Sequence, residues 1–361
     1  TMTKTKIAFL IGIPLIAIMG FRTVRDTGLL LSLESITAGQ CERISGPVGA
    51  EDMSIDQINN IAYIAADDRR AYLRHGNMEN TENGKLWTLD LSNPNSQPQI
   101  LTLDIDGIFH PHGMALRSDE SGAKELYVVN HLSTTKHEID VFTILAPGKL
   151  HLKRRITYPE LISPNDLVVV AEDQFFVSND HGNPRHTVWE VLEDYLGLPF
   201  SSVTYFDGQK GHFAIEGLRY ANGLALSADQ QSLYVAESAG RGIKRYSKGT
   251  SMLDWELEDS HYVDSMVDNL EWDEQGRLLT GAHPKGFDFL AHSKDAKALS
   301  PSEIIRIDVR QKDITHETLH LDMGEGISGS SVAVINGQTL LIGPVFEPHF
   351  MRCTMEEAPK T

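Results

Sequence analysis

The sequence predicts an all-β protein: a six-bladed β-propeller with a hydrophobic helix at its N-terminus and one short capping helix. Three observations support this prediction. Short segments rich in Val, Ile, Leu, Tyr and Phe fill the chain from about Cys41 onward, and turns of Asp, Asn, Gly, Ser and Pro separate them. Six similar units recur at a spacing of roughly fifty residues, which is the range of propeller blades. The chain also has two cysteines, Cys41 and Cys353, one near each end.

The N-terminal helix is predicted from a charged and then apolar pattern. Lys4 and Lys6 precede an apolar run over residues 7–21, as in an export signal. The run is short for a membrane span, which needs about 20 residues, and no A-x-A cleavage site follows it. We therefore expect a retained signal anchor over residues 1–26 and one propeller domain over residues 27–361. A cleaved signal peptide is the alternative.

Two short helices are expected outside the blades. Residues 27–39 have the pattern of a short amphipathic helix. Residues 187–196 have helical periodicity, with these residues on one face: Val188, Trp189, Leu192, Tyr195 and Leu196. We expect this second helix to cap the mouth of the propeller and, with the N-terminal segment, to lie against a membrane. Burial against the propeller alone is the alternative.

Composition limits the class of partner. The chain has 361 residues, 41% of them hydrophobic, which is enough for one large all-β domain. Its formal net charge of −18 argues against a nucleic-acid partner, because phosphate binding requires basic patches.

The two cysteines are either buried free thiols or one disulfide. We favour a disulfide between Cys41 and Cys353, because a pair at opposite ends of a circular fold would hold the circle closed. Such a bond implies export to an oxidising compartment, periplasmic or extracellular.

Each of the six units opens with a small or polar pair, and these pairs predict a cation site. They are Glu51-Asp52, His112-Gly113, Asn165-Asp166, Asn222-Gly223, Asp268-Asn269 and Ser330-Ser331. The innermost strand of each blade lines the channel of a propeller, so residues at one repeat position converge. Carboxylates that meet there repel one another unless a cation lies among them. An all-oxygen set that includes Asn carbonyls suits calcium. The alternative is that these are ordinary turn residues at strand ends.

At these residues the sequence resembles the paraoxonase family, from about Cys41 to Cys353. The resemblance rests on Glu51-Asp52, Pro111-His112-Gly113, Val129-Asn130-His131, Asn165-Asp166, Asn179-Asp180-His181, Ala221-Asn222-Gly223, Val267-Asp268-Asn269 and His283-Pro284. It implies a calcium-dependent lactonase and arylesterase that holds two calcium ions in its channel, with a disulfide that joins the chain ends.

The resemblance also implies the ligands of each ion. The catalytic calcium would be held by Glu51, Asn165, Asn222, Asp268 and Asn269. The structural calcium would be held by Asp52, Asp166 and the backbone carbonyl of Met114. Two departures limit the comparison. Ala282 stands where several relatives have a cysteine, and residues 67–83 match the family poorly, so its substrate range does not transfer.

A general base is expected beside the catalytic ion, because calcium lowers the pKa of bound water less than zinc does. The resemblance implies a dyad in which His112 is the base and His131 orients it. The alternative is that both are hydrogen-bonded structural histidines.

Other residues are expected around the same mouth. Asp180, His181 and His283 either support the metal and His112 or supply an alternative base for phosphotriesters. Tyr220, Leu290, Val345 and Phe346 are candidate apolar walls, although ordinary core residues would have the same pattern.

The expected function is therefore hydrolysis of small lactones, including acyl-homoserine lactones, and of aryl esters. An organophosphate triesterase or fluorophosphatase is the enzymatic alternative. A calcium-stabilised propeller scaffold without catalysis is the alternative from another class.

Overall fold

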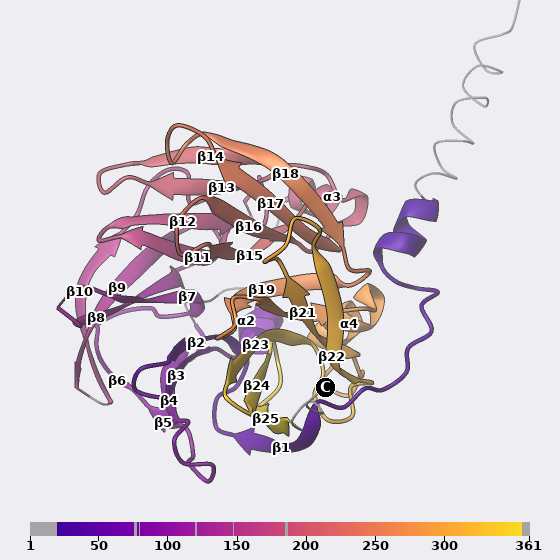
Figure 1. The fold of residues 1–361 in the computed structure, drawn as a ribbon, viewed down its shortest axis with the longest axis horizontal. Coiled ribbons are helices and arrows are strands. Elements are labelled where there is room, and N and C mark those ends of the chain that lie inside the picture. Colours follow the sequence, from indigo (N-terminus) through magenta and orange to yellow (C-terminus); the bar gives the residue numbers. More distant parts are fainter. Residues whose placement is uncertain are drawn as a thin grey trace, which may run out of the picture.

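Six sheets surround a central channel in the computed structural model (Figure 1), which describes residues 20–75, 78, 80–119, 121–146, 148–184 and 187–355. Neighbouring strands are antiparallel within each sheet, except that β6 and β10 pair in parallel. This is the predicted six-bladed propeller.

The six blades are described in order around the ring, and the strands of each blade are given from the innermost to the outermost. The first blade comprises β2 (Ala50–Asp56), β3 (Ile61–Ala66), β4 (Lys85–Asp90) and β5 (Gln99–Ile100). The second comprises β7 (Pro111–Ser118), β8 (Lys124–His131), β9 (His137–Ala146), β10 (Lys149–Ile156) and β6 (Thr102–Asp104). The third comprises β11 (Pro164–Ala171), β12 (Gln174–Asn179), β13 (Ser201–Phe206) and β14 (Gly211–Leu218). The fourth comprises β15 (Ala221–Leu226), β16 (Ser232–Glu237), β17 (Gly242–Lys248) and β18 (Trp255–Tyr262). The fifth comprises β19 (Met266–Trp272), β20 (Leu278–His283), β21 (Ser302–Asp308) and β22 (Thr315–Asp322). The sixth comprises β23 (Ser330–Asn336), β24 (Thr339–Pro344), β25 (His349–Met355) and β1 (Gly39–Ser45).

The core is divided among the six interfaces between neighbouring blades. Each of six apolar clusters combines side chains from two adjacent blades. In one of them Phe350 of the sixth blade and Ile64 of the first are both fully buried. The six inner strands contact one another around the channel. Burial between blades therefore fixes the inner strands, and with them the residues at their starts.

Both ends of the chain build the sixth blade. Strand β1 pairs with β25 over seven residues, and Cys41 lies opposite Cys353. The two cysteines form a disulfide, with their Cα atoms 4.0 Å apart. The predicted disulfide is confirmed, and it closes the ring across a sequence separation of 312 residues.

The prediction of a helix over residues 27–39 is wrong. A short helix spans residues 20–26, and turns and an extended segment follow it. Gly28 has a φ of 63°, which ends the helix. The extended segment is then tied to the fifth blade, because Lys285 Nζ donates to the carbonyl of Leu31 and Ile36 forms a bridge to Leu321. The rest of the predicted signal anchor, residues 1–19, lies outside the described residues.

The second predicted helix is confirmed as α3 (Val188–Leu196), which Thr187 caps at its start and Gly197 at its end. Its apolar face is not buried. Trp189 is 62% exposed and Tyr195 64% exposed, whereas Glu193 is buried. Glu193 Oε2 accepts a hydrogen bond from the backbone of Gly182 at 2.9 Å. The polar face therefore holds α3 on the propeller, and the structure does not show the alternative, in which the apolar face is buried against the propeller.

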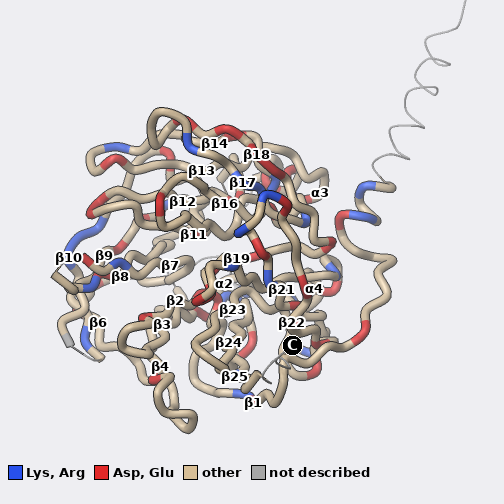
Figure 2. Tube along the Cα trace, in the orientation of Figure 1, with Lys and Arg blue, Asp and Glu red and all other residues tan. Residues whose placement is uncertain are grey.

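Two other helices, α2 (Arg69–His75) and α4 (Gly286–Lys294), connect the second and third strands of the first and fifth blades. Figure 1 places α2 at the centre of the ring in this view. None of the helices in the described ranges is long and apolar enough to cross a membrane. Acidic and basic residues are interspersed around the ring, with no large basic face in this view (Figure 2).

Candidate active site and cation sites

A break in strand pairing turns the opening residues of every inner strand out of the ladder. In each blade the register between the inner strand and its neighbour shifts near the opening pair. In the third blade it shifts between Pro164 and Leu167, which frees Asn165 and Asp166 from regular pairing. Such bulges redirect side chains. The six shifts explain why the opening pairs converge on the channel.

Glycine in two of these pairs lets the inner strands approach one another closely. A Cβ on Gly113 would lie 2.4 Å from the carbonyl oxygen of Asn165 in the next blade. A Cβ on Gly223 would lie 2.4 Å from the backbone nitrogen of Leu270. Both distances are too short for any other residue, so these glycines set the width of the channel.

Three asparagine amides point their oxygens away from the protein's own hydrogen-bond donors. Asn165, Asn222 and Asn269 are buried, and none of their Oδ1 atoms has a hydrogen-bond partner among the described residues. Each amide nitrogen is anchored. Asn222 Nδ2 donates to Ser238 Oγ at 3.2 Å, and Asn269 Nδ2 donates to the carbonyl oxygen of Glu51 at 2.9 Å. Buried oxygens without donors are costly unless a cation takes them.

Two buried carboxylates belong to the same group. Glu51 Oε1 accepts hydrogen bonds from Ser331 Oγ and Asn269 Nδ2, both at 3.0 Å. Asp268 Oδ2 lies 3.0 Å from His283 Nε2. Asn269 and Glu51 are thus in direct contact, and all five residues predicted to hold the catalytic cation are buried at the starts of inner strands.

Glu51 also forms an ion pair with an arginine, Arg69, which the sequence interpretation missed. Arg69, the first residue of α2, is buried with its guanidinium 3.4 Å from Glu51 Oε2. It also donates to the carbonyls of Gly49 and Pro111, both at 3.1 Å. Burial raises the pKa of Glu51, but His112 and Arg69 outweigh it and hold the pKa at about 2. Glu51 is therefore ionised at neutral pH.

Asp52 and Asp166 form a second pair of buried carboxylates at the starts of inner strands. Each carboxylate accepts two backbone N–H groups, one from its own strand and one from another blade; the latter are Met114 at 2.6 Å and Leu224 at 2.7 Å. Burial and the charge of Glu51 raise the pKa of Asp52 to about 8. Burial and the charge of Asp52 raise the pKa of Asp166 well above its usual value. A cation between Asp52 and Asp166 would stabilise the ionised form of both carboxylates.

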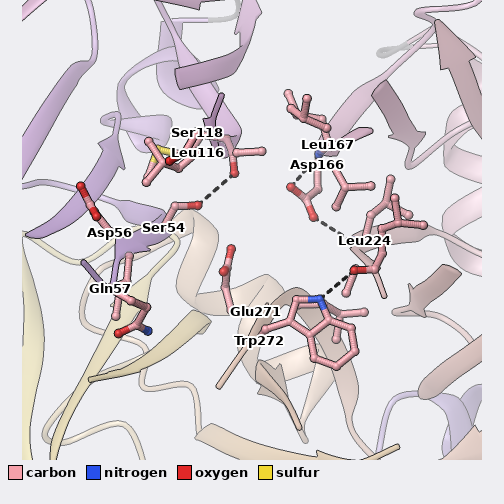
Figure 3. A pocket seen from close by; sticks show the side chains of 18 of the residues that line it. Ser54, Asp56, Gln57, Leu116, Ser118, Asp166, Leu167, Leu224, Glu271 and Trp272 are labelled. Atoms are coloured by element: carbon pink, nitrogen blue, oxygen red, sulfur yellow. Dashed lines mark hydrogen bonds between the residues drawn. The ribbon is translucent and has the colours of Figure 1, made fainter. Parts of the chain in front are cut away.

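A third carboxylate, which the sequence interpretation missed, faces this pair. Glu271 points into a cavity of about 420 Å³ that Asp166, Met114 and Ser54 also line (Figure 3). Burial, followed by the charges of Asp52 and Asp166, raises the pKa of Glu271 well above its usual value. The only sequence signal is its place two residues after Asn269.

The predicted histidine dyad is in hydrogen-bond contact. His112 opens β7 and His131 ends β8, and His112 Nδ1 lies 2.8 Å from His131 Nε2. The other ring nitrogen of His112 lies 3.3 Å from Glu51 Oε1. A third histidine, which the sequence interpretation missed, continues the contact: His131 Nδ1 lies 2.8 Å from His137 Nδ1.

His181 lies between two carboxylates. Its Nδ1 is 2.7 Å from Asp180 Oδ1, and its Nε2 is 2.9 Å from Asp194 Oδ1 on α3. Burial lowers the pKa of His181, but the charges and hydrogen bonds of the two aspartates raise it to about 10. A protonated imidazole cannot accept a proton, so the geometry does not support His181 as an alternative base. Asp180 also accepts from Asn165 Nδ2 at 3.4 Å, which is the supporting role.

The predicted apolar residues lie on three separate segments. Tyr220 packs edge-on against His181, with ring centroids 5.0 Å apart. Phe346 packs against Phe289 of α4 at 5.7 Å and is buried, as is Val345, whereas Leu290 on α4 is 38% exposed. Arg70 of α2 lies over the Phe346 ring at 5.1 Å, which ties α2 to this wall.

The donor set fits a hard cation. Three or more His, Cys, Asp or Glu side chains do not cluster as a metal site anywhere in the described ranges. One set, the outer group, instead combines the amide oxygens of the three asparagines with the carboxylates of Glu51 and Asp268. The other set, the inner group, combines the carboxylates of Asp52 and Asp166 with the backbone carbonyl of Met114. Oxygen-only sets of this kind match calcium.

Comparison with known proteins gives concordant matches. The arylesterase family model matches residues 32–354. Human serum paraoxonase/arylesterase 1 is 31% identical over 335 residues, covering 88% of this chain and 89% of that protein. Rabbit (Oryctolagus cuniculus) serum paraoxonase/lactonase 3 is 29% identical over 362 residues, covering 96% and 98%.

Solved structures match the fold. A luciferin-regenerating enzyme superposes with a TM-score of 0.53 at 14% identity, covering 88% of this chain and 96% of that one. A calcium-binding protein, regucalcin, from Agrobacterium tumefaciens superposes with a TM-score of 0.52 at 12% identity, covering 90% and 96%.

Proposed function

The chain belongs to the arylesterase family, and we propose that it is a calcium-dependent hydrolase that opens lactones and cleaves aryl esters. Family membership supports ester and lactone hydrolysis, since the similar relatives are named arylesterases and lactonases. Calcium dependence, the ligand sets and the roles of the histidines are our proposal.

The observation that supports calcium most strongly is the set of three buried amide oxygens without donors. Asn165, Asn222 and Asn269 come from three different blades, yet the Oδ1 atom of each accepts no hydrogen bond from the described residues. With Glu51 and Asp268 they would hold one ion, and Asp52, Asp166 and the carbonyl of Met114 would hold a second. A protein without a cation would leave these oxygens at a cost of about 1–3 kcal/mol each.

Calcium bound at the outer position would polarise the ester carbonyl and stabilise the oxyanion. His112 supplies the base. Its Nε2 faces the outer ligand group, where it takes the proton of the attacking water as oxygen bonds to the carbonyl carbon. Its Nδ1 is held by His131 at 2.8 Å, which fixes the ring. When the ester bond breaks, the same proton passes to the leaving alkoxide.

We also propose export and association with a membrane or lipid surface. The disulfide supports an oxidising compartment. The exposed apolar face of α3 supports a lipid surface, because Val188, Trp189 and Tyr195 present apolar area with no cover among the described residues.

The test is hydrolysis of γ- and δ-lactones, phenyl acetate and a phosphotriester, first with calcium and then with EGTA. We expect lactones and phenyl acetate to turn over and EGTA to abolish the rate. Preferred turnover of the phosphotriester would favour the triesterase alternative. Calcium binding without hydrolysis of any substrate would favour the scaffold alternative and contradict the role of His112.

A further inference from the structure

We propose that His137 is a positioning residue: its Nδ1 accepts a hydrogen bond from His131 and thereby selects the tautomer in which His112 is a base. This inference rests on the proposed role of His112. It concerns a residue six positions after His131, on the strand that returns beside it.

The three rings form one buried chain of contacts. His112, His131 and His137 are 8%, 4% and 5% exposed. Their successive nitrogen pairs are both 2.8 Å apart, and the adjacent rings are close to perpendicular, at 67° and 87°. His131 and His137 are directly opposite in the antiparallel pair of β8 and β9. The β8–β9 hairpin therefore fixes the contact between His131 and His137.

The chain can point in either of two directions. A neutral imidazole has one N–H and one lone pair, and each nitrogen-to-nitrogen contact needs one donor and one acceptor. A basic His112 needs its lone pair on Nε2, so its Nδ1–H donates to His131 Nε2. His131 then carries its own proton on Nδ1 and donates it to His137 Nδ1.

The opposite direction is unproductive. If His137 donated to His131, then His131 would donate to His112, and the proton of His112 would sit on Nε2. That proton would face Glu51 Oε1 at 3.3 Å, and no lone pair would remain for water. An acceptor at His137 Nδ1 therefore favours the productive direction, just as a second partner fixes the tautomer in other histidine sites.

Two substitutions at one position separate the hydrogen bond from packing. His137→Leu removes the acceptor, while His137→Asn keeps an amide oxygen close to the place of Nδ1. We expect His137→Leu to lower lactonase kcat roughly 10- to 100-fold with little change in KM, and His137→Asn to recover most of the loss. The matched control is His261→Leu. It removes one member of an exposed histidine pair, His261 and His316, whose nitrogens are also 2.8 Å apart on the outer strands β18 and β22.

Imidazole ¹⁵N spectra of the calcium-loaded protein give a readout that needs no activity. We expect the His112 and His131 resonances to report the productive tautomers in the wild type and in His137→Asn, and a changed tautomer in His137→Leu. Unchanged spectra in His137→Leu, or a kcat in His137→Asn as low as in His137→Leu, would overturn the proposal. A wild type that hydrolyses no ester would refute the proposed function, while the spectra would still decide whether His137 sets the tautomers.

Discussion

Calcium binding should release protons from the channel, because the inner carboxylates hold protons when no cation is present. The perturbation is calcium removal with EGTA at a series of pH values. Burial and neighbouring negative charge raise the pKa of Asp52 from 3.8 to about 8, and they also raise the pKa of Asp166 above its usual value. At pH 7 Asp52 is therefore largely protonated, and it must lose its proton to act as a calcium ligand.

The size of the effect follows from these pKa values. A carboxyl with a pKa of about 8 carries roughly 0.9 proton at pH 7, so Asp52 should release about one proton per protein when calcium binds. The sign for stability is also fixed. The folded calcium-free protein keeps a proton on Asp52 that the unfolded chain has lost, so its free energy of unfolding falls as pH rises from 3.8 to about 8. The fall amounts to at most roughly 6 kcal/mol for this group.

Isothermal titration in two buffers of different ionisation enthalpy would count the protons released. Urea unfolding with and without calcium would measure the pH dependence. His181 adds a fall between pH 6.5 and about 10 that calcium does not cancel, so the difference between the two forms is the relevant quantity. Release of less than about 0.3 proton at pH 7 would mean that the carboxylates are ionised without calcium, and would refute this reasoning.

Three further predictions follow from the ring, the dyad and the exposed helix. His112→Gln should lower lactonase kcat by about 10²- to 10⁴-fold while titration calorimetry still detects calcium binding, and an unchanged kcat would exclude His112 as the base. Joint replacement of Cys41 and Cys353 by Ser should reduce the free energy of unfolding by up to about 6 kcal/mol, because a 312-residue loop is no longer closed; an unchanged urea midpoint would argue against this entropy. Trp189→Ser should weaken binding to liposomes without changing kcat/KM for a soluble lactone, and equal binding of both forms would show that α3 does not touch lipid.

The sequence could predict what the blade repeat determines. The opening pairs of six units recur in register, so the pairs that contain Asn165, Asn222 and Asn269 could be placed around one channel from the sequence alone. The terminal cysteines could be paired because a ring must close. These features depend on strand order alone, and the structure confirms the fold and the disulfide.

The remaining features depend on partners that no repeat specifies. The face that α3 buries is set by Glu193 and its contact with Gly182, so the apolar stripe alone could not decide between a membrane and the propeller. Arg69 lies in a segment without a blade pattern, and its ion pair with Glu51 joins residues from two different elements. His137 could have been found from the hairpin register, because six residues separate it from its partner across β8 and β9.

Because the last strand closes the ring, the residues of the proposed cation site come together only late in synthesis. Glu51 in the first blade accepts a hydrogen bond from Asn269 in the fifth, 218 residues later. Cys41 forms its disulfide with Cys353, which is near the other end of the chain. At ribosomal rates of about 5–20 residues per second, the partner of Cys41 emerges roughly 15–60 s after it. During that interval the N-terminal edge strand is unpaired and the first blade's acidic residues have no complete site. If the proposed calcium site exists, it can therefore be completed only after the last blade has formed.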